Sequence, residues 1–216
     1  MNLLNSSPAV LFSGLVTLVI SLTVHEFAHA WTAVRFGDDT PRFAGRLTLN
    51  PLKHLDPIGS IMLIFAGFGW AKPVPVNPYV LKRHSPAALM FVALAGPLSN
   101  FLLAVLAAIP LRFGLLPVQI YASQYFPTMH EFLLYFIFTN LGLMLFNLLP
   151  IPPLDGEKIL SFLLPGELGR FYEQIRPYGP LMLLMVLLIG PMIGFNILDM
   201  LLSPIMYTIG RFLLGG

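Results

Sequence analysis

The chain has 216 residues, of which 56% are hydrophobic and only 10% are charged, and its mean hydropathy is +0.80. A soluble domain carries about 25% charged residues, so this composition excludes an ordinary soluble protein and indicates a polytopic membrane protein. The net charge of +2 is too small to favour nucleic acid as a partner, and the absence of cysteine excludes disulfides and thiolate metal sites. We therefore expect a single membrane domain over residues 1–216, in contact with the lipid bilayer.

The first predicted element is an apolar helix from Pro8 to Arg35, which is long enough to cross a bilayer. Ser7 followed by Pro8 is typical of a helix start. The residues before it lack the positive segment and cleavage site of a signal peptide, so we expect the helix to be retained. Basic residues follow it closely, and the positive-inside rule then places the N-terminus outside; these residues are Arg35, Arg42, Arg46 and Lys53.

The last third of this helix contains the motif His-Glu-Phe-Ala-His. His25 and His29 are four residues apart and therefore share one helix face, with Glu26 beside them. Two imidazole nitrogens and a neighbouring carboxylate are what a hydrolytic zinc ion requires, namely two ligands and a base for water. The alternative is a bundle interior that merely buries these side chains, which is costly without a metal or a partner. We therefore predict a metal site in the cytoplasmic half of the membrane.

Two short stretches after the first helix are predicted to be extended. Residues 42–50 alternate loosely between apolar and polar side chains and end at a proline, which is typical of a short strand. Residues 72–77 belong to a run with three prolines in six residues, which excludes a helix. Between them, residues 57–71 are apolar but only about half a span long. Because basic residues flank both ends, we expect a re-entrant or tilted segment that starts and ends on the cytoplasmic side.

Two further spans are predicted over residues 87–111 and 131–149, joined by an external loop at 113–129 that contains no Lys or Arg. The first contains the small-residue stretch 95–100, which allows close helix approach. The last apolar region, 180–214, holds one full span, and its prolines leave the path of the remainder open. The fold class is therefore an all-α polytopic membrane protein with about five to six membrane segments and short strand-like stretches near the cytoplasmic side.

A hydrolytic zinc site needs a third protein ligand and an open position for water. Asp155 is the best candidate, because it follows the span that ends at residue 149, at the depth expected for the histidine pair. Prolines interrupt the helix there, and unwound backbone at membrane depth is tolerated where it is buried in protein or lines a wet cavity. A surface turn with the sequence Pro-Leu-Asp-Gly is the alternative, and spacing alone does not decide between the two. His54 and Asp56 are expected to be structural.

Taken in order, the motifs resemble those of the site-2 proteases, the zinc intramembrane metalloproteases. The first is His25-Glu26-Phe27-Ala28-His29, and the last is Asn147-Leu148-Leu149-Pro150-Ile151-Pro152-Pro153-Leu154-Asp155-Gly156. The stretch 95–100, Ala-Gly-Pro-Leu-Ser-Asn, resembles a third motif that lies between these two in the family. The resemblance covers residues 25–156, and this chain has neither a PDZ nor a CBS insertion, so it resembles a minimal, prokaryotic-type member.

The resemblance implies a role for each motif residue. One zinc ion per chain is bound by His25, His29 and Asp155, and Glu26 is the general base. Asn147 helps to hold the substrate carbonyl or oxyanion, and Asn100 contacts the substrate. The implied activity is hydrolysis of a peptide bond in or near the transmembrane segment of a single-span membrane protein, within the cell membrane (regulated intramembrane proteolysis).

The sequence alone leaves two points undecided, the function of the metal site and the segment that binds the substrate. A zinc transporter or a non-catalytic scaffold is the alternative function, although the polar groups cluster at one depth and the outer half of the first span is almost purely apolar. A helical substrate must unwind before cleavage, and its freed backbone groups then need partners. Residues 42–49 and 72–77 are candidates for pairing with it by strand addition, or are only surface connections.

Overall fold

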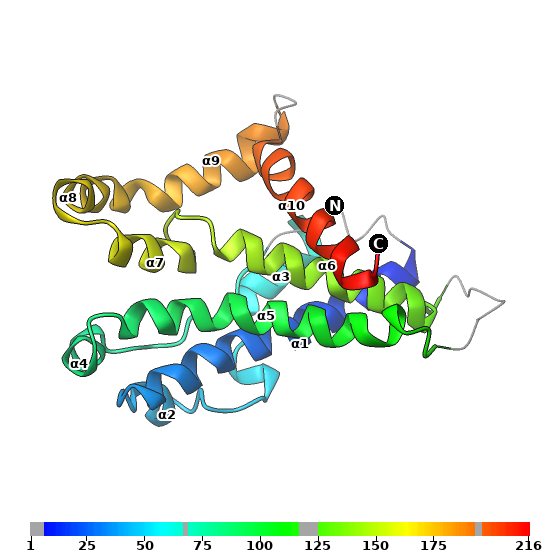
Figure 1. Cartoon of the computed structure of the whole chain (residues 1–216), viewed down its shortest axis with the longest axis horizontal. Helices are drawn as coiled ribbons and strands as arrows, with labels where there is room; N and C mark the ends of the chain where they lie inside the picture. Colours follow the sequence, from blue (N-terminus) through cyan, green and yellow to red (C-terminus); the bar gives the residue numbers. More distant parts are fainter. Residues whose placement is uncertain (1–6, 67–68, 117–124, 193–195) are drawn as a thin grey trace.

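The computed structural model describes residues 7–66, 69–116, 125–192 and 196–216, and these are helical over most of their length (Figure 1). The helices, with three-residue 3-10 turns marked η, are α1 (Pro8–Arg35), α2 (Thr40–Phe43), η2 (Pro51–Lys53), α3 (Pro57–Ala66), α4 (Pro78–His84), α5 (Ala88–Arg112), α6 (Met129–Asn147), α7 (Asp155–Leu163), α8 (Gly166–Ile175), η3 (Arg176–Tyr178), α9 (Gly179–Met192) and α10 (Ile197–Leu214).

Four of these helices, α1, α5, α6 and α10, are long and apolar enough to cross a membrane. The helices predicted as spans near 8–35, 87–111 and 131–149 are present, with bounds within two residues of the prediction at each end, and they are candidate membrane spans. The count of five to six segments is not confirmed, because α3 and α9 have only 10 and 14 residues. Part of the segment predicted at 57–71 and part of the loop predicted at 113–129 lie outside the described residues, as does Gly194 in the last apolar region.

The ends of the long helices follow from local side-chain chemistry. Ser7 Oγ accepts a hydrogen bond from Val10 N at the start of α1, as expected for an N-cap. At the start of α6, Thr128 and Glu131 form a capping box, in which each side chain accepts from the other residue's backbone N–H. At its other end α6 stops at Asn147, shortly before the proline-rich run 150–153.

The strand predicted over residues 42–50 is wrong. Residues 40–43 form the short helix α2, and residues 44–50 are turns and bends. The Asp38 carboxylate accepts from Thr40 N at 3.0 Å and from Thr40 Oγ1, which favours a helical turn at this point. Gly45 follows with φ +67°, a left-handed conformation that ends the helix and redirects the chain. The alternation of apolar and polar residues does not follow burial here, because Phe43 and Leu49 are largely exposed whereas Arg46 is buried.

Residues 72–77 contain no helix, as predicted, and Asn77 has an extended backbone, but the predicted strand-like character is not confirmed, because the stretch forms no strand. The segment is held at both ends. Lys72 N donates to His54 O at 2.8 Å, and Asn77 N donates to the Asp38 carboxylate at 2.6 Å. An isolated antiparallel bridge joins Leu55 to Ala71 just before the segment. These bonds fix the segment against the loop that follows α1.

Helix α5 is the centre of the bundle and packs against α1, α6 and α7. Its alanines allow close approach to larger side chains of α6, so that the two helices share the largest buried cluster; its members are Ala104, Ala107, Ala108, Phe136, Ile137, Leu141 and Met144. On α10, Gly210 faces the Phe138 ring, where an added Cβ would lie 2.6 Å from a ring carbon. The Arg112 guanidinium donates to Phe212 O at 2.7 Å, which places the end of α10 beside the end of α5.

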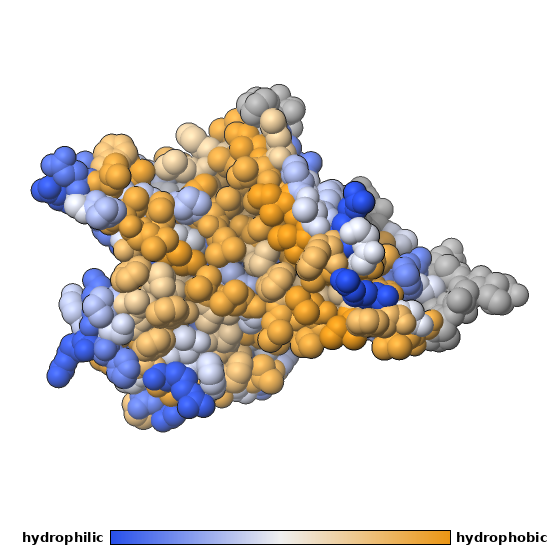
Figure 2. All heavy atoms as spheres, viewed as in Figure 1, coloured by the Kyte–Doolittle hydropathy of each residue, from blue (hydrophilic) through white to orange (hydrophobic). Residues whose placement is uncertain are grey.

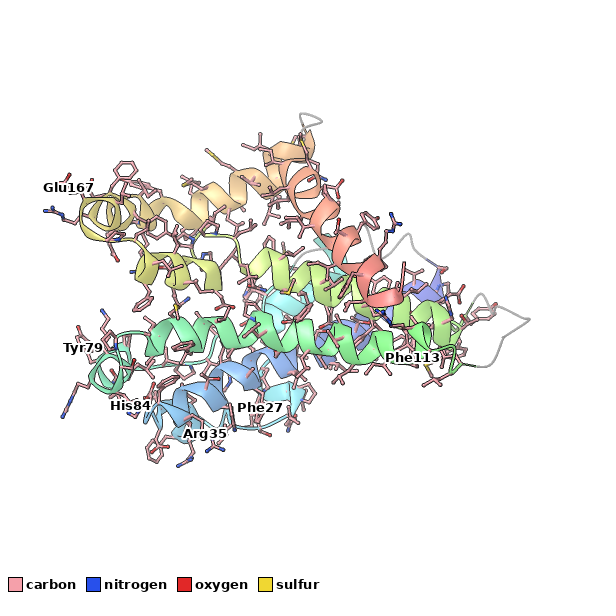
Figure 3. All side chains as sticks on the ribbon, viewed as in Figure 1. Phe27, Arg35, Tyr79, His84, Phe113 and Glu167 are labelled. Carbon is pink, nitrogen blue, oxygen red and sulfur yellow. The ribbon has the colours of Figure 1, made fainter. Side chains whose placement is uncertain are left out.

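The surface polarity agrees with a membrane-spanning bundle. Figure 2 shows hydrophobic residues over the middle of the molecule and hydrophilic residues gathered over α2, α4 and α8 at one end and near the end of α10 at the other. Tyr79, His84 and Glu167 lie at the first of these ends and Phe113 at the opposite one (Figure 3). Because α1 runs toward the end that contains Tyr79, its histidine pair lies nearer to that end than to the other.

One sequence interpretation of α1 needs correction. The outer half of α1 was expected to be almost purely apolar, but it buries three hydroxyl side chains, those of Ser13, Thr17 and Ser21. They are spaced four residues apart, in line with His25 on the same face. Ser13 Oγ donates to Ala9 O, whereas the hydroxyls of Thr17 and Ser21 find no partner among the described residues.

Candidate metal centre

The structure brings together three side chains that are distant in sequence. His25 and His29 come from α1, and Asp155 is the first residue of α7. The two Nε2 atoms are 3.0 Å apart, and Asp155 Oδ2 lies 3.1 Å from His25 Nε2 and 3.2 Å from His29 Nε2. In the described part of the chain this is the group of histidine and acidic side chains that is arranged to hold a metal ion.

The second nitrogen of each imidazole fixes which nitrogen carries the proton. His29 Nδ1 lies 2.7 Å from Val92 O, and a backbone carbonyl only accepts, so Nδ1–H is the donor. His25 Nδ1 lies 2.6 Å from Asn100 Oδ1 and donates to it in the same way. In the neutral rings both Nε2 atoms therefore present lone pairs toward the Asp155 carboxylate. Three electron-pair donors that face one another at this distance repel, and a cation between them would stabilise the arrangement.

The spacing of the donors fits zinc. Ligand atoms about 2.0–2.1 Å from a tetrahedral zinc ion lie about 3.3 Å from one another, close to the 3.0–3.2 Å found between these three atoms. Gly96 on α5 keeps the adjoining space open, because a Cβ there would lie 2.5 Å from the Nε2 atoms of both His25 and His29. Two histidines and one carboxylate also match the ligand set of hydrolytic zinc sites.

The loop that carries Asp155 is fixed from both sides. Gly156 lies so close to the end of α6 that an added Cβ would be 2.2 Å from Leu148 O. Tyr172 Oη donates to Pro150 O at 2.9 Å, and buried Glu157 accepts from Arg176 Nε at 2.7 Å. These contacts attach the start of α7 to α6, α8 and η3 and thereby hold Asp155 toward the histidines.

Electrostatics favour the ionised form of Asp155. Burial acts to raise the pKa of the carboxyl group, but positive charge on the imidazoles of His29 and His25, when they are protonated, outweighs that effect and lowers the pKa below its ordinary value. When the rings are neutral, a bound cation would supply the same positive charge. A deprotonated carboxylate is the form that binds a metal ion.

Glu26 is buried beside the histidine pair and faces a buried arginine. Arg46 Nη2 lies 3.8 Å from Glu26 Oε2. Burial lowers the pKa of the Arg46 guanidinium, and the Glu26 carboxylate opposes that shift. An arginine remains charged after such a shift, so the carboxylate has a permanent positive partner.

Arg46 also holds the segment 72–77 next to this site. Its guanidinium donates to Pro73 O at 3.0 Å and to Lys72 O, and it lies 3.5 Å from His54 Nδ1. His54 is fully buried, and its Nε2 donates to Thr48 O at 2.7 Å. His54 therefore orders the loop around Arg46, in keeping with the structural role expected for it, and lies apart from the three ligands.

The two asparagines singled out by the resemblance lie in different surroundings. Asn147 is half-buried at the end of α6, and its Nδ2 donates to Leu143 O at 3.0 Å. Asn100 is fully buried; its Oδ1 accepts from His25, and its Nδ2 donates to Asn140 Oδ1 at 3.0 Å. Since both ends of the Asn100 amide are used within the protein, its position favours holding His25 over the substrate contact that the resemblance implies.

Three residues near the site were not assigned a site role from the sequence. Gly96 belongs to the stretch 95–100, which gives it a motif resemblance and a packing role but no site role; Arg46 enters only as a basic residue that sets topology, and Asn140 has no predicted role. Asn140 had a usable signal, because a polar side chain in the middle of an apolar span is costly unless it has a specific partner. For Gly96 the only signal was its place in the stretch 95–100 that resembles a family motif, and Arg46 gave none, since the contacts of both residues depend on how separate segments pack.

Comparison with known proteins gives a consistent result. Residues 13–116 and 114–190 match peptidase family M50. The chain is similar to YwhC of Bacillus subtilis, named as a candidate zinc metalloprotease, with 43% identity over 190 residues that cover 86% of this chain and 84% of the relative. It is also similar to Rip2 of Mycolicibacterium smegmatis, named in the same way, with 35% identity over 192 residues covering 83% and 70%. No solved structure matches the chain.

Proposed function

The chain belongs to peptidase family M50, the family of the site-2 proteases, and is a multi-pass membrane protein; on this premise we propose that it is an intramembrane zinc metalloprotease. Its substrate is a single-span membrane protein, cleaved in or near the transmembrane segment. The convergence of His25, His29 and Asp155 within 3.2 Å of one another is the observation that supports this most strongly. We assign these three side chains as the ligands of one zinc ion.

The proposed mechanism uses the residues around this centre. Zinc, when bound, supplies Lewis acidity, which activates water at neutral pH and polarises the scissile carbonyl. Glu26 accepts the proton of the attacking water on its carboxylate and delivers it to the nitrogen of the leaving amine. Arg46, 3.8 Å away, orients that carboxylate. We assign Asn147 to the developing oxyanion, a contribution of about 3 kcal/mol for one such donor; its amide must turn from Leu143 O to make it.

The substrate must present an extended backbone at this site, because a helix hides its amide bonds. We assign residues 72–77 to pairing with it by strand addition. Their non-helical backbone supports this assignment, and so does their attachment to Arg46, the residue that also faces Glu26. Residues 42–49 are no longer candidates, because they form a helical turn and bends.

We place the N-terminus outside the cell membrane and the metal centre in the cytoplasmic half. Basic residues support this orientation, since Arg35, Lys82 and Arg83 belong to the end of the bundle where α1 stops and α4 lies. Arg112 and Arg211 belong to the opposite end, because Arg112 binds the last turn of α10. This distribution satisfies the positive-inside rule with the α4 end in the cytoplasm.

A metal transporter is the second candidate, and one observation favours it. The buried hydroxyls of Ser13, Thr17 and Ser21 continue the line of His25 along α1, as a polar path toward the metal centre would. Glu26 distinguishes the two functions, because transport needs no general base.

The test is cleavage of a single-span membrane protein by the purified chain in detergent, with wild type and Glu26→Gln compared at equal zinc content. We expect Glu26→Gln to retain zinc and to lose at least about 100-fold in cleavage rate, the usual contribution of a general base. Equal cleavage by both proteins would reject the assignment of Glu26. If neither protein cleaves any of a panel of substrates while both hold zinc, metal transport becomes the better account.

A further inference from the structure

Helix α6 places one fully buried amide in the middle of its apolar sequence. Asn140 Nδ2 donates to Phe136 O at 2.9 Å, and Asn140 Oδ1 accepts from Asn100 Nδ2 at 3.0 Å. Asn100 Oδ1 in turn accepts from His25 Nδ1 at 2.6 Å. A continuous chain of three hydrogen bonds therefore runs from a backbone carbonyl of α6, through α5, to a histidine of α1.

The carbonyl at the far end sets the direction of the whole chain. Phe136 O can only accept, so Asn140 must turn its NH₂ group toward it and its carbonyl oxygen toward Asn100. Asn100 must then turn its NH₂ group toward Asn140 and its carbonyl oxygen toward His25. The proton of His25 is thereby kept on Nδ1, and its Nε2 lone pair faces His29 and Asp155.

We propose that Asn140 is a positioning residue for the metal centre, which acts through Asn100 to fix the tautomer and orientation of His25. The proposal rests on the assignment of His25 as a metal ligand, but not on proteolysis. Without Asn140, nothing prevents the Asn100 amide from turning over and presenting its NH₂ group to His25 Nδ1. His25 then accepts at Nδ1 and carries its proton on Nε2, where it blocks the metal.

His29 provides an internal comparison. Its Nδ1 donates directly to Val92 O, a backbone carbonyl that cannot turn over. The tautomer of His29 is therefore independent of Asn140, and a change at Asn140 acts on one of the two histidines only.

The experiment compares wild type with Asn140→Leu, which has a similar volume but no hydrogen-bonding groups, and measures zinc affinity by competition with a chelator. We expect Asn140→Leu to bind zinc about 10–100-fold more weakly, the usual effect of losing a partner that orients a metal ligand. Asn140→Asp, in the protonated form that full burial favours, keeps both a donor for Phe136 O and an acceptor for Asn100 Nδ2, and so holds the Asn100 amide in place. We expect it to recover most of the affinity.

A second readout uses the metal-free protein. Imidazole nitrogen shifts of ¹⁵N-histidine-labelled protein distinguish the two tautomers, and the chain has only five histidines. In Asn140→Leu we expect the His25 signals to show protonated Nε2 in part of the population, with His29 unchanged. This readout does not depend on catalysis, so a failure of the protease assignment leaves it interpretable.

The matched control is Ile137→Ala on the same helix. Ile137 is fully buried in the α5–α6 cluster and takes no part in the hydrogen-bond chain. We expect this variant to lower thermal stability while zinc affinity and the His25 tautomer stay at wild-type values. Equal loss of zinc affinity in Ile137→Ala and Asn140→Leu, or an unchanged His25 tautomer in Asn140→Leu, would overturn the proposal and leave Asn140 a packing residue.

Discussion

Gly96 is the residue on which the geometry of the metal centre depends most directly. It lies on α5 opposite both imidazoles, at a point where a methyl group would come within 2.5 Å of two Nε2 atoms. Neither ring can move away easily, because Val92 O and Asn100 Oδ1 hold their Nδ1 atoms at 2.7 and 2.6 Å. The absence of a side chain at this position is therefore a condition for binding the metal.

We expect Gly96→Ala to abolish stoichiometric zinc binding while the helices remain intact. The measurement is zinc content by mass spectrometry, together with helical content by circular dichroism. Gly142→Ala on α6 is the control, because its added Cβ would meet only Met206 Sδ at an ordinary 3.7 Å. Full zinc content in Gly96→Ala would contradict the geometry described for this centre.

Residues that lie close together on one helix were predictable from sequence, and their partners on other helices were not. Spacing alone puts His25, Glu26 and His29 on one face of a helix. Asp155 needed a resemblance between motifs, because 130 positions separate it from His25. Asn140 reaches the site only through Asn100, so its role depends on the packing of α5 against α6.

At the scale of elements, the segment 72–77 is linked to Glu26 through Arg46 and offers an unpaired backbone N–H. Val74 N–H finds no acceptor among the described residues, whereas the carbonyl groups of Lys72 and Pro73 bind Arg46. A segment that is already fixed at both ends loses little conformational entropy when a second strand pairs with it.

We expect Val74→Pro to impair cleavage by about 10-fold or more with unchanged zinc content, because it removes an N–H that the proposed strand pairing uses. The residue already precedes Pro75, so a proline fits its extended backbone. Val74→Ala is the control, since it shortens the side chain but keeps the N–H. Cleavage would be followed with one substrate for all three proteins, and equal rates would remove the strand-pairing hypothesis.

The elements themselves were predictable to different degrees. Long apolar runs define α1, α5 and α6, because only a helix satisfies the backbone of such a run in lipid. The prediction of a strand over residues 42–50 was wrong, because alternation of apolar and polar residues over a short stretch also occurs in turns. Here the hydrogen bond from Thr40 N to the Asp38 carboxylate stabilises a turn. The spacing of apolar residues along the sequence gives no information about that hydrogen bond.

At the scale of the whole molecule, the charges at the two ends of the bundle determine its orientation in the membrane. Glu167 lies at the end that contains α4 and α8, and Phe113 lies at the opposite end (Figure 3). Phe113 is largely exposed, and so is Glu167. On the proposed topology the two positions lie on opposite sides of the bilayer.

The chain contains no cysteine, so single cysteines can be placed at either end without a background. We expect Phe113→Cys to react with a membrane-impermeant maleimide in intact cells, and Glu167→Cys to react only after permeabilisation. The unmodified chain is the control for labelling of other groups. The reverse pattern would invert the proposed topology and place the metal centre in the outer half of the membrane.

The division of the ligands between α1 and the start of α7 has a consequence for the biogenesis of the protein. The segment from His25 to Asp155 is more than half of the chain, and the proposed zinc ion, shared by its two ends, would close it into one loop. A ligand that binds only the folded form stabilises that form, so the ion acts as a removable cross-link. A newly inserted chain whose later helices have not yet docked has two ligands and no third. On the proposed function, the hydrolytic centre would thus be completed only by correct assembly, and incompletely folded copies would not cleave neighbouring membrane proteins.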